Sequence, residues 1–206
     1  MDAVFWFSVT LACLLGAMSP GPSLAVIGSV TLNQGRLAGI VSALAHGLTI
    51  AAFALLTALG LVVVMSSYAV IFNLLQLIGC IYLVWMALKL LFAAPGSSPE
   101  LIVLAGGSHW AAARDGFLVA LVNPKIIIFF TALFSQFVTV EGELWVKLLM
   151  AAIAGVVDTL WYMLVAVVIS QPGALVRYQN SSAWLNKVFG LVLLGIVAGI
   201  VVELVT

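Results

Sequence analysis

The chain has 206 residues, of which 65% are hydrophobic and only 7% are charged, and its seven basic residues balance seven acidic ones. A soluble domain carries about 25% charged residues, so too few charges are present to cover a surface that faces water. The composition excludes a soluble globular protein, and the balanced charge offers no basic surface for nucleic acid. We therefore expect an all-α, polytopic membrane protein embedded in a lipid bilayer.

Long apolar runs divide the chain into six predicted transmembrane helices. A helix needs about 20 apolar residues to cross the hydrocarbon core, and each run reaches that length. The predicted helices, numbered 1 to 6, are Ala3–Leu32, Leu37–Met65, Ala69–Ala93, Ala113–Val138, Leu144–Ser170 and Trp184–Leu204. They form a single transmembrane domain over 1–206, with halves of about 1–93 and 113–206. The loop between the halves, 94–112, is too short for a further domain.

The first predicted helix could be mistaken for a secretory signal, because Ala17-Met18-Ser19 resembles a small-residue cleavage site. A signal peptide begins with a basic segment, whereas Asp2 is the only charged residue before Arg36. The apolar run also continues past the candidate cleavage site. We therefore expect helix 1 to be retained as a transmembrane span.

The basic residues predict the orientation in the membrane. Six spans put loops 1–2, 3–4 and 5–6 on one side, and both termini with loops 2–3 and 4–5 on the other. The basic residues near the first set of loops are Arg36, Lys89, Arg114, Arg177 and Lys187. Near the second set there is only Lys147. Because cytoplasmic loops are enriched in Lys and Arg, we expect the first set in the cytoplasm and both termini on the external, periplasmic side.

Two proline motifs interrupt the apolar spans, one in each half of the chain. The sequence SPGP at Ser19–Pro22 lies within helix 1, and NPK at Asn123–Lys125 lies within helix 4. Proline lacks an N–H and clashes with the preceding turn, so each motif is expected to break its helix and free backbone polar groups. Inside a membrane such groups are tolerated only where they face protein or a wet cavity. Three spans per half, each half starting with a broken helix, predict an inverted 3+3 repeat, which is a transporter architecture.

The break residues suit an anion. Asn123 and Pro124 read as the N-cap and first residue of a half-helix, and Ser19-Pro20 or Gly21-Pro22 can be read the same way. A half-helix N-terminus presents free N–H groups and partial positive charge, which favours a carboxylate, and Lys125 adds a full charge. The residues predicted to bind substrate here are Ser19, Pro20, Gly21, Pro22, Asn123, Pro124 and Lys125. The alternative is that the prolines only kink the spans for packing.

Asp158, in the middle of helix 5, is the residue for which we expect a role in proton coupling. Intramembrane acids are costly and usually functional, and the structural alternative is an ion pair with Lys125. Trp161 and Tyr162 follow Asp158 at i+3 and i+4, so they share its face and are predicted to line the same cavity. His46 in helix 2 either hydrogen-bonds a neighbouring helix or titrates as a second proton-coupling group.

Small residues recur at helical spacing in two of the predicted spans. Gly39, Ala43 and Gly47 form a stripe on helix 2, and Gly195 with Gly199 forms another on helix 6. Such stripes allow helix backbones to approach closely, either within one protomer or between two protomers. We expect packing surfaces without chemistry, and the helix 6 stripe would allow a homodimer.

Six segments together resemble one known family over essentially the whole chain, in the same order. They are SPGP at 19–22, GIVSALAHG at 39–47, GCIYLVWMALKLL at 79–91, NPKIIIFFTALFSQFV at 123–138, DTLW at 158–161 and LNKVFGLVLLGIVAGI at 185–200. They look like the LysE/RhtB-type amino-acid exporters. The resemblance implies a protein of the bacterial inner membrane that exports amino acids or close derivatives, driven by the proton gradient. His46 departs from the pattern, since a small or apolar residue is expected before Gly47.

Other classes of protein fit the residues less well. A membrane thiol-electron carrier would place a proline-flanked cysteine in each half, whereas Cys13 and Cys80 both lie in the first half without a flanking proline. A cation permease is a further alternative. A non-transporting scaffold protein would leave Asp158 and Lys125 unexplained. We find no catalytic triad, nucleotide-binding loop or metal-ligand spacing, so we expect no enzyme activity, metal or cofactor. The predicted partners are an amino-acid substrate, protons and the bilayer.

Overall fold

The computed structural model describes residues 3–19, 21–92, 107–138 and 143–171, together with short stretches between 187 and 198. Every regular element in these residues is helical, as predicted. The helices are α1 (Ala3–Met18), α2 (Pro22–Gln34), α3 (Arg36–Ser67), α4 (Ala69–Leu91), α5 (His109–Leu121), α6 (Pro124–Phe137) and α7 (Leu144–Ile169). The predicted sixth span, Trp184–Leu204, lies largely outside the described residues.

Three of these helices, α3, α4 and α7, are each long and apolar enough to cross a membrane. The pairs α1–α2 and α5–α6 also qualify when each is taken as one span, although the first is bent by 62° and the second by 55°. The described part of the chain therefore contains up to five spans. The predicted membrane-embedded helical fold is confirmed, while the sixth span and the inverted repeat stay predictions.

Local sequence explains both breaks. Gly21 is the N-cap of α2 in an extended conformation, and Pro22 is the first helical residue, where a missing N–H costs nothing. At the second break Asn123 is the N-cap of α6, and its Oδ1 accepts a hydrogen bond of 3.1 Å from the backbone N–H of Lys125. The capping role predicted for Asn123 is confirmed, and in helix 1 it is Gly21, not Ser19, that caps the half-helix.

Most of the described helix boundaries lie within two residues of the prediction, and the start of α5 differs more. Helix α5 begins at His109, four residues before the predicted Ala113 and inside the predicted loop 94–112. The Ser108 hydroxyl accepts a hydrogen bond from the backbone N–H of Ala111, which satisfies one of the free donors at the start of the helix. Apolar periodicity alone missed this start because His109 is not apolar.

Helices α3 and α7 cross in backbone contact at two glycines. A Cβ on Gly47 would lie 1.8 Å from Thr159 Oγ1 and 2.8 Å from the carbonyl oxygen of Gly155. A Cβ on Gly155 would lie 2.6 Å from that of Ala51. Only residues without a side chain fit there. The predicted packing role of the Gly39–Gly47 stripe is confirmed, within one protomer.

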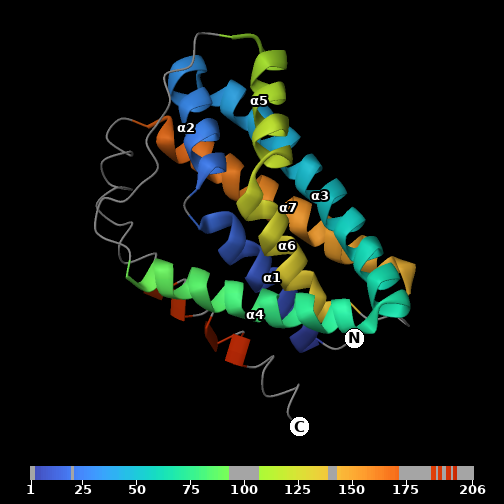
Figure 1. Cartoon of the computed structure of the whole chain (residues 1–206). Coiled ribbons are helices and arrows are strands. Elements are labelled where there is room, and N and C mark those ends of the chain that lie inside the picture. Colours follow the sequence, from blue (N-terminus) through green and yellow to red (C-terminus); the bar gives the residue numbers. More distant parts are fainter. Residues whose placement is uncertain are drawn as a thin grey trace.

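The two broken pairs pack against this α3–α7 centre, with α1 and α2 contacting α7 and α5 contacting α3. Figure 1 shows α2 and α5 at one end of the molecule, α1 and α6 at the other, and α4 lying across α6. Gly107, just before α5, lies beside Gln34 at the end of α2, because a Cβ on Gly107 would be 3.1 Å from Gln34 Oε1. The connections after α2 and before α5 thus lie at the same end, as the prediction for loops 1–2 and 3–4 requires.

Candidate functional site

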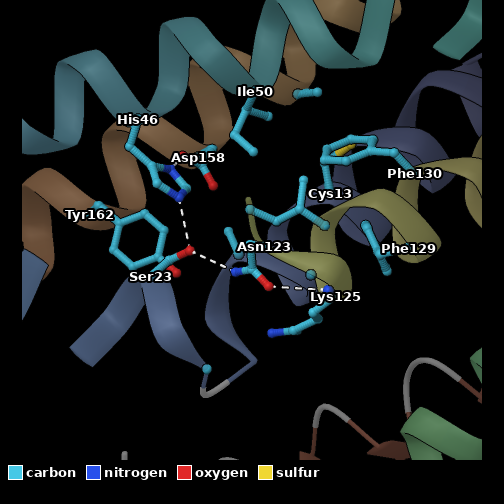
Figure 2. Close-up of a pocket in the computed structure, with 15 residues that line it drawn as sticks. Cys13, Ser23, His46, Ile50, Asn123, Lys125, Phe129, Phe130, Asp158 and Tyr162 are labelled. Carbon is cyan, nitrogen blue, oxygen red and sulfur yellow. Dashed lines mark hydrogen bonds and ion pairs between the residues drawn. The ribbon is translucent and has the colours of Figure 1, made fainter. Parts of the chain in front are cut away.

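A small buried cavity lies where the two helix breaks meet between α3 and α7 (Figure 2). Its volume is about 30 Å³, which accommodates roughly two water molecules. Pockets that bind small molecules are typically about 300–1,000 Å³, so the cavity is too small for such a ligand in this conformation. Its lining includes both breaks and the central helices, which brings together residues more than 100 positions apart in the sequence.

Asp158 pairs with His46 inside this cavity. Asp158 Oδ2 lies 2.6 Å from His46 Nδ1, and their side chains are 9% and 1% exposed. The close crossing of α3 and α7 brings the two groups together, because His46 precedes Gly47 on α3 and Asp158 lies one turn after Gly155 on α7. A buried carboxylate requires a charged or hydrogen-bonding partner, and the imidazole is that partner.

Ser23 extends the pair into a chain of hydrogen bonds across four helices. Ser23 Oγ lies 2.9 Å from His46 Nε2, and Asn123 Nδ2 donates to Ser23 Oγ at 3.2 Å. The Ser23 hydroxyl has one hydrogen and two acceptor lone pairs, so it can accept from Asn123 and hydrogen-bond His46 Nε2 in either tautomer. The chain of Asp158, His46, Ser23 and Asn123 ties α7 and α3 to the first turn of α2 and the α5–α6 break (Figure 2).

Lys125 lies in the same cavity but has a different partner. Its Nζ donates a 2.7 Å hydrogen bond to the backbone oxygen of Ser19, which directly follows the last turn of α1. The C-terminal end of a helix carries partial negative charge, and the N-terminal end carries partial positive charge. The end of α1 therefore stabilises the Lys125 ammonium, which the N-terminus of α6 destabilises. The direct Lys125–Asp158 ion pair considered from the sequence is absent among the described side chains, and His46 takes that place.

The two aromatic residues predicted beside Asp158 separate. Tyr162 lines the cavity, where its ring centroid lies 4.9 Å from that of His46 in an edge-on arrangement. Trp161 is not part of the lining and is partly buried against an apolar cluster that includes Leu24 and Ile27 of α2 and Tyr162 itself. Trp161 Nε1 is buried and has no acceptor among the described residues. The i+3 and i+4 positions share a helical face, but only the i+4 side chain reaches the cavity.

The predicted break residues divide in a similar way. Gly21, Asn123 and Lys125 line the cavity. Ser19 is buried and contributes its backbone oxygen, whereas Pro22 is exposed. Pro20 lies outside the described residues, and Pro124 occupies the first position of α6.

Sequence reasoning missed Ser23 and the apolar half of the lining. Ser23 follows Pro22 directly, and a hydroxyl in the first turn of a half-helix at a membrane break was the available signal. The cavity residues Cys13, Ile50, Phe129 and Phe130 are apolar side chains in apolar spans, so nothing in the sequence distinguished them from core. Among the described residues no three His, Cys, Asp or Glu side chains cluster as metal ligands would.

Comparison with known proteins gives one consistent result. The family described as LysE type translocator matches residues 14–203. A threonine efflux protein of Salmonella typhimurium is 24% identical over 198 residues, covering 93% of this chain and 95% of that protein. A homoserine/homoserine lactone efflux protein of Salmonella typhi is 28% identical over 193 residues, with 92% of each chain covered. An uncharacterized membrane protein of Vibrio cholerae is 27% identical over 201 residues, with 95% of each covered. No solved structure matches the chain significantly.

Proposed function

This chain belongs to the LysE family of translocators, and from that premise we propose that it is a secondary active exporter of amino acids, or close derivatives, coupled to protons. The observation that carries the proposal is the convergence of Lys125 and the Asp158–His46 pair on one small cavity between two broken helices. Relatives named as efflux proteins for threonine and for homoserine support the direction and the substrate class.

The two charged groups of the cavity suit the two ends of an amino acid. Lys125 Nζ is the donor for the α-carboxylate, and the partial positive charge at the start of α6 adds to its attraction. The Asp158 carboxylate is the acceptor for the α-ammonium. Each group now has an internal partner, the Ser19 oxygen for Lys125 and His46 for Asp158. The substrate would replace these partners, so neither buried charge is left unpaired in either state.

Proton coupling follows from competition at Asp158. When the α-ammonium leaves, the carboxylate again needs positive charge nearby, which a proton on the Asp158–His46 pair would supply. When a substrate arrives from the cytoplasm, its ammonium makes that proton redundant and favours its release. Proton and substrate therefore exclude each other at one group, which is the requirement for exchanging one against the other across the membrane.

Alternating access is the transport mechanism that suits the small cavity. A volume of about 30 Å³ is too small for any amino acid, so binding requires the surrounding helices to separate. The half-helices α1–α2 and α5–α6 are already divided at the level of the cavity. We propose that they move on either side of a fixed α3–α7 centre within an inverted 3+3 repeat. The protein would act in the bacterial inner membrane with both termini periplasmic.

The rival functions have less support. Cys13 lines the cavity, but Cys80 is on α4 and is not part of the lining, so a thiol relay through the cavity has one sulfur only. A cation permease is less well supported, because the positive charge of Lys125 beside the pathway would repel a cation.

The test is an export assay with the purified protein in liposomes. The vesicles are loaded with single labelled amino acids, and release is measured with and without an imposed pH gradient. We expect release of at least one amino acid, accelerated when protons flow in the opposite direction. Release that ignores the pH gradient would contradict proton coupling, and no release of any amino acid from well-folded protein would contradict export.

A further inference from the structure

The cavity has two chemically different walls. The polar wall comprises His46, Asp158, Tyr162, Ser23 and Asn123, and the apolar wall comprises Cys13, Ile50, Phe129 and Phe130. Figure 2 shows the two groups facing each other, with Lys125 below them. In the proposed binding scheme, Asp158 of the polar wall binds the α-ammonium of an amino acid and Lys125 binds its α-carboxylate. The apolar wall has no part in that scheme and is left for the side chain of the substrate.

Charge balance limits what that side chain can be. Among the described residues that line the cavity there is one carboxylate, Asp158, and one lysine, Lys125. The α-ammonium and α-carboxylate of a substrate match these two groups one to one. The other described acids, Asp115 and Glu143, are not part of the lining. A basic or acidic side chain would therefore bring a third charge to a buried apolar wall without a counter-charge, which strongly disfavours binding.

Phe129 sets the depth of the apolar wall. Its ring, on α6, packs against the backbone of Gly16 on α1, because a Cβ on Gly16 would lie 2.6 Å from Phe129 Cε1 and Cζ. Ile50, on α3, is 1% exposed and closes the wall from another helix. The Phe129 ring occupies the space that a side chain at Gly16 would fill, so the position of the ring depends on Gly16 having no side chain.

We propose that the apolar wall is the side-chain subsite, that the substrates are α-amino acids with uncharged aliphatic side chains, and that Phe129 sets the upper limit of side-chain size. This inference rests on the proposed function, since it assigns the substrate class of the same cavity. We expect side chains of one to four carbons to be accepted beside Phe129 once the surrounding helices separate. Larger rings collide with it.

The first test compares amino acids on wild-type protein in liposomes. Alanine, valine, leucine, phenylalanine, lysine and glutamate are each offered for exchange, and kcat/KM is measured. We expect an aliphatic substrate to exceed lysine and glutamate by about a hundredfold or more, because their third charge has no partner. Equal efficiency for a charged and an aliphatic amino acid would overturn the subsite while leaving export intact. No exchange of any amino acid would overturn the proposed function, and this inference with it.

The second test moves the size limit. Phe129→Ala should raise the kcat/KM of phenylalanine relative to valine by about tenfold or more, the usual scale for added or removed apolar contacts. Gly16→Ala should do the opposite and lower leucine relative to alanine, because the added methyl or the displaced ring takes up cavity space. Each result is a ratio between two substrates on one protein, so it does not depend on how much of a variant folds.

The matched control is Phe117→Ala, which removes an aromatic ring of α5 that is 44% exposed and not part of the cavity lining. Its substrate ratios should equal those of the wild type. Unchanged ratios in both Phe129→Ala and Gly16→Ala, or a shift of the same size in Phe117→Ala, would overturn the assignment of Phe129.

Discussion

Replacing Asp158 by asparagine should uncouple export from the proton gradient without unfolding the protein. Asparagine retains a carbonyl oxygen that can accept the hydrogen bond now made by His46 Nδ1 at 2.6 Å, so the contact between α3 and α7 survives. What is lost is the titratable acid. The described residues of the cavity lining contain one carboxyl group, so we expect one proton to be exchanged per substrate.

The stoichiometry sets the size of the effect. One pH unit is worth about 1.4 kcal/mol per proton, so a one-to-one exchanger can build about a tenfold substrate gradient from it. The measurement is the steady-state ratio of labelled substrate across liposome membranes at one pH unit of gradient, with the membrane potential held at zero. We expect a ratio of about ten for the wild type and about one for Asp158→Asn. Asp158→Glu should retain part of the gradient, because it keeps an acid one methylene longer.

Asp115→Asn is the matched control, because it removes an acid that pairs with Arg114 on α5 and lies outside the cavity lining. It should behave as the wild type. A full tenfold gradient in well-folded Asp158→Asn would refute the role of Asp158 as an obligatory proton carrier. Loss of the gradient in both variants would show that the assay reports damage to the protein and not coupling.

Three further predictions address the carboxylate site, the orientation and the packing. Lys125→Gln should abolish most export while membrane insertion is kept, and Lys125→Arg should retain part of it; near-wild-type export by both would contradict the carboxylate role. Cysteines replacing the exposed Trp110 and Leu144, in protein freed of native cysteines, should label from the cytoplasm and from outside respectively; the opposite result would reverse the orientation. Gly47→Ala should destabilise the protein by about 1–3 kcal/mol, seen as a lower melting temperature in detergent, because its Cβ meets Thr159 and backbone. Gly60→Ala on the same helix meets nothing within 4 Å and should not lower it.

The sequence supports predictions of the fold wherever the membrane itself imposes the constraint. A hydrocarbon core admits only long apolar helices, so the spans corresponding to α3, α4 and α7 could be read from composition alone. Proline chemistry is equally local, which is why the breaks before Pro22 and Pro124 could be placed within a few residues. The start of α5 was missed because Ser108 caps it through a side chain, a signal independent of hydrophobicity.

The partners of the buried charges could not be read in the same way, because partner choice depends on how helices distant in the sequence cross. From the sequence, an ion pair with Lys125 is the structural alternative to a proton-coupling role for Asp158. The crossing at Gly47 and Gly155 decides otherwise, because it brings the neighbouring His46 within 2.6 Å of the carboxylate. Lys125 is then satisfied by the end of α1. In this arrangement the two charges have separate partners, so the proposed substrate would displace His46 at one end and the Ser19 oxygen at the other, with no direct Lys125–Asp158 contact to break. His46, for which the sequence leaves open a hydrogen-bonding or a titrating role, is thus the residue that pairs with the acid.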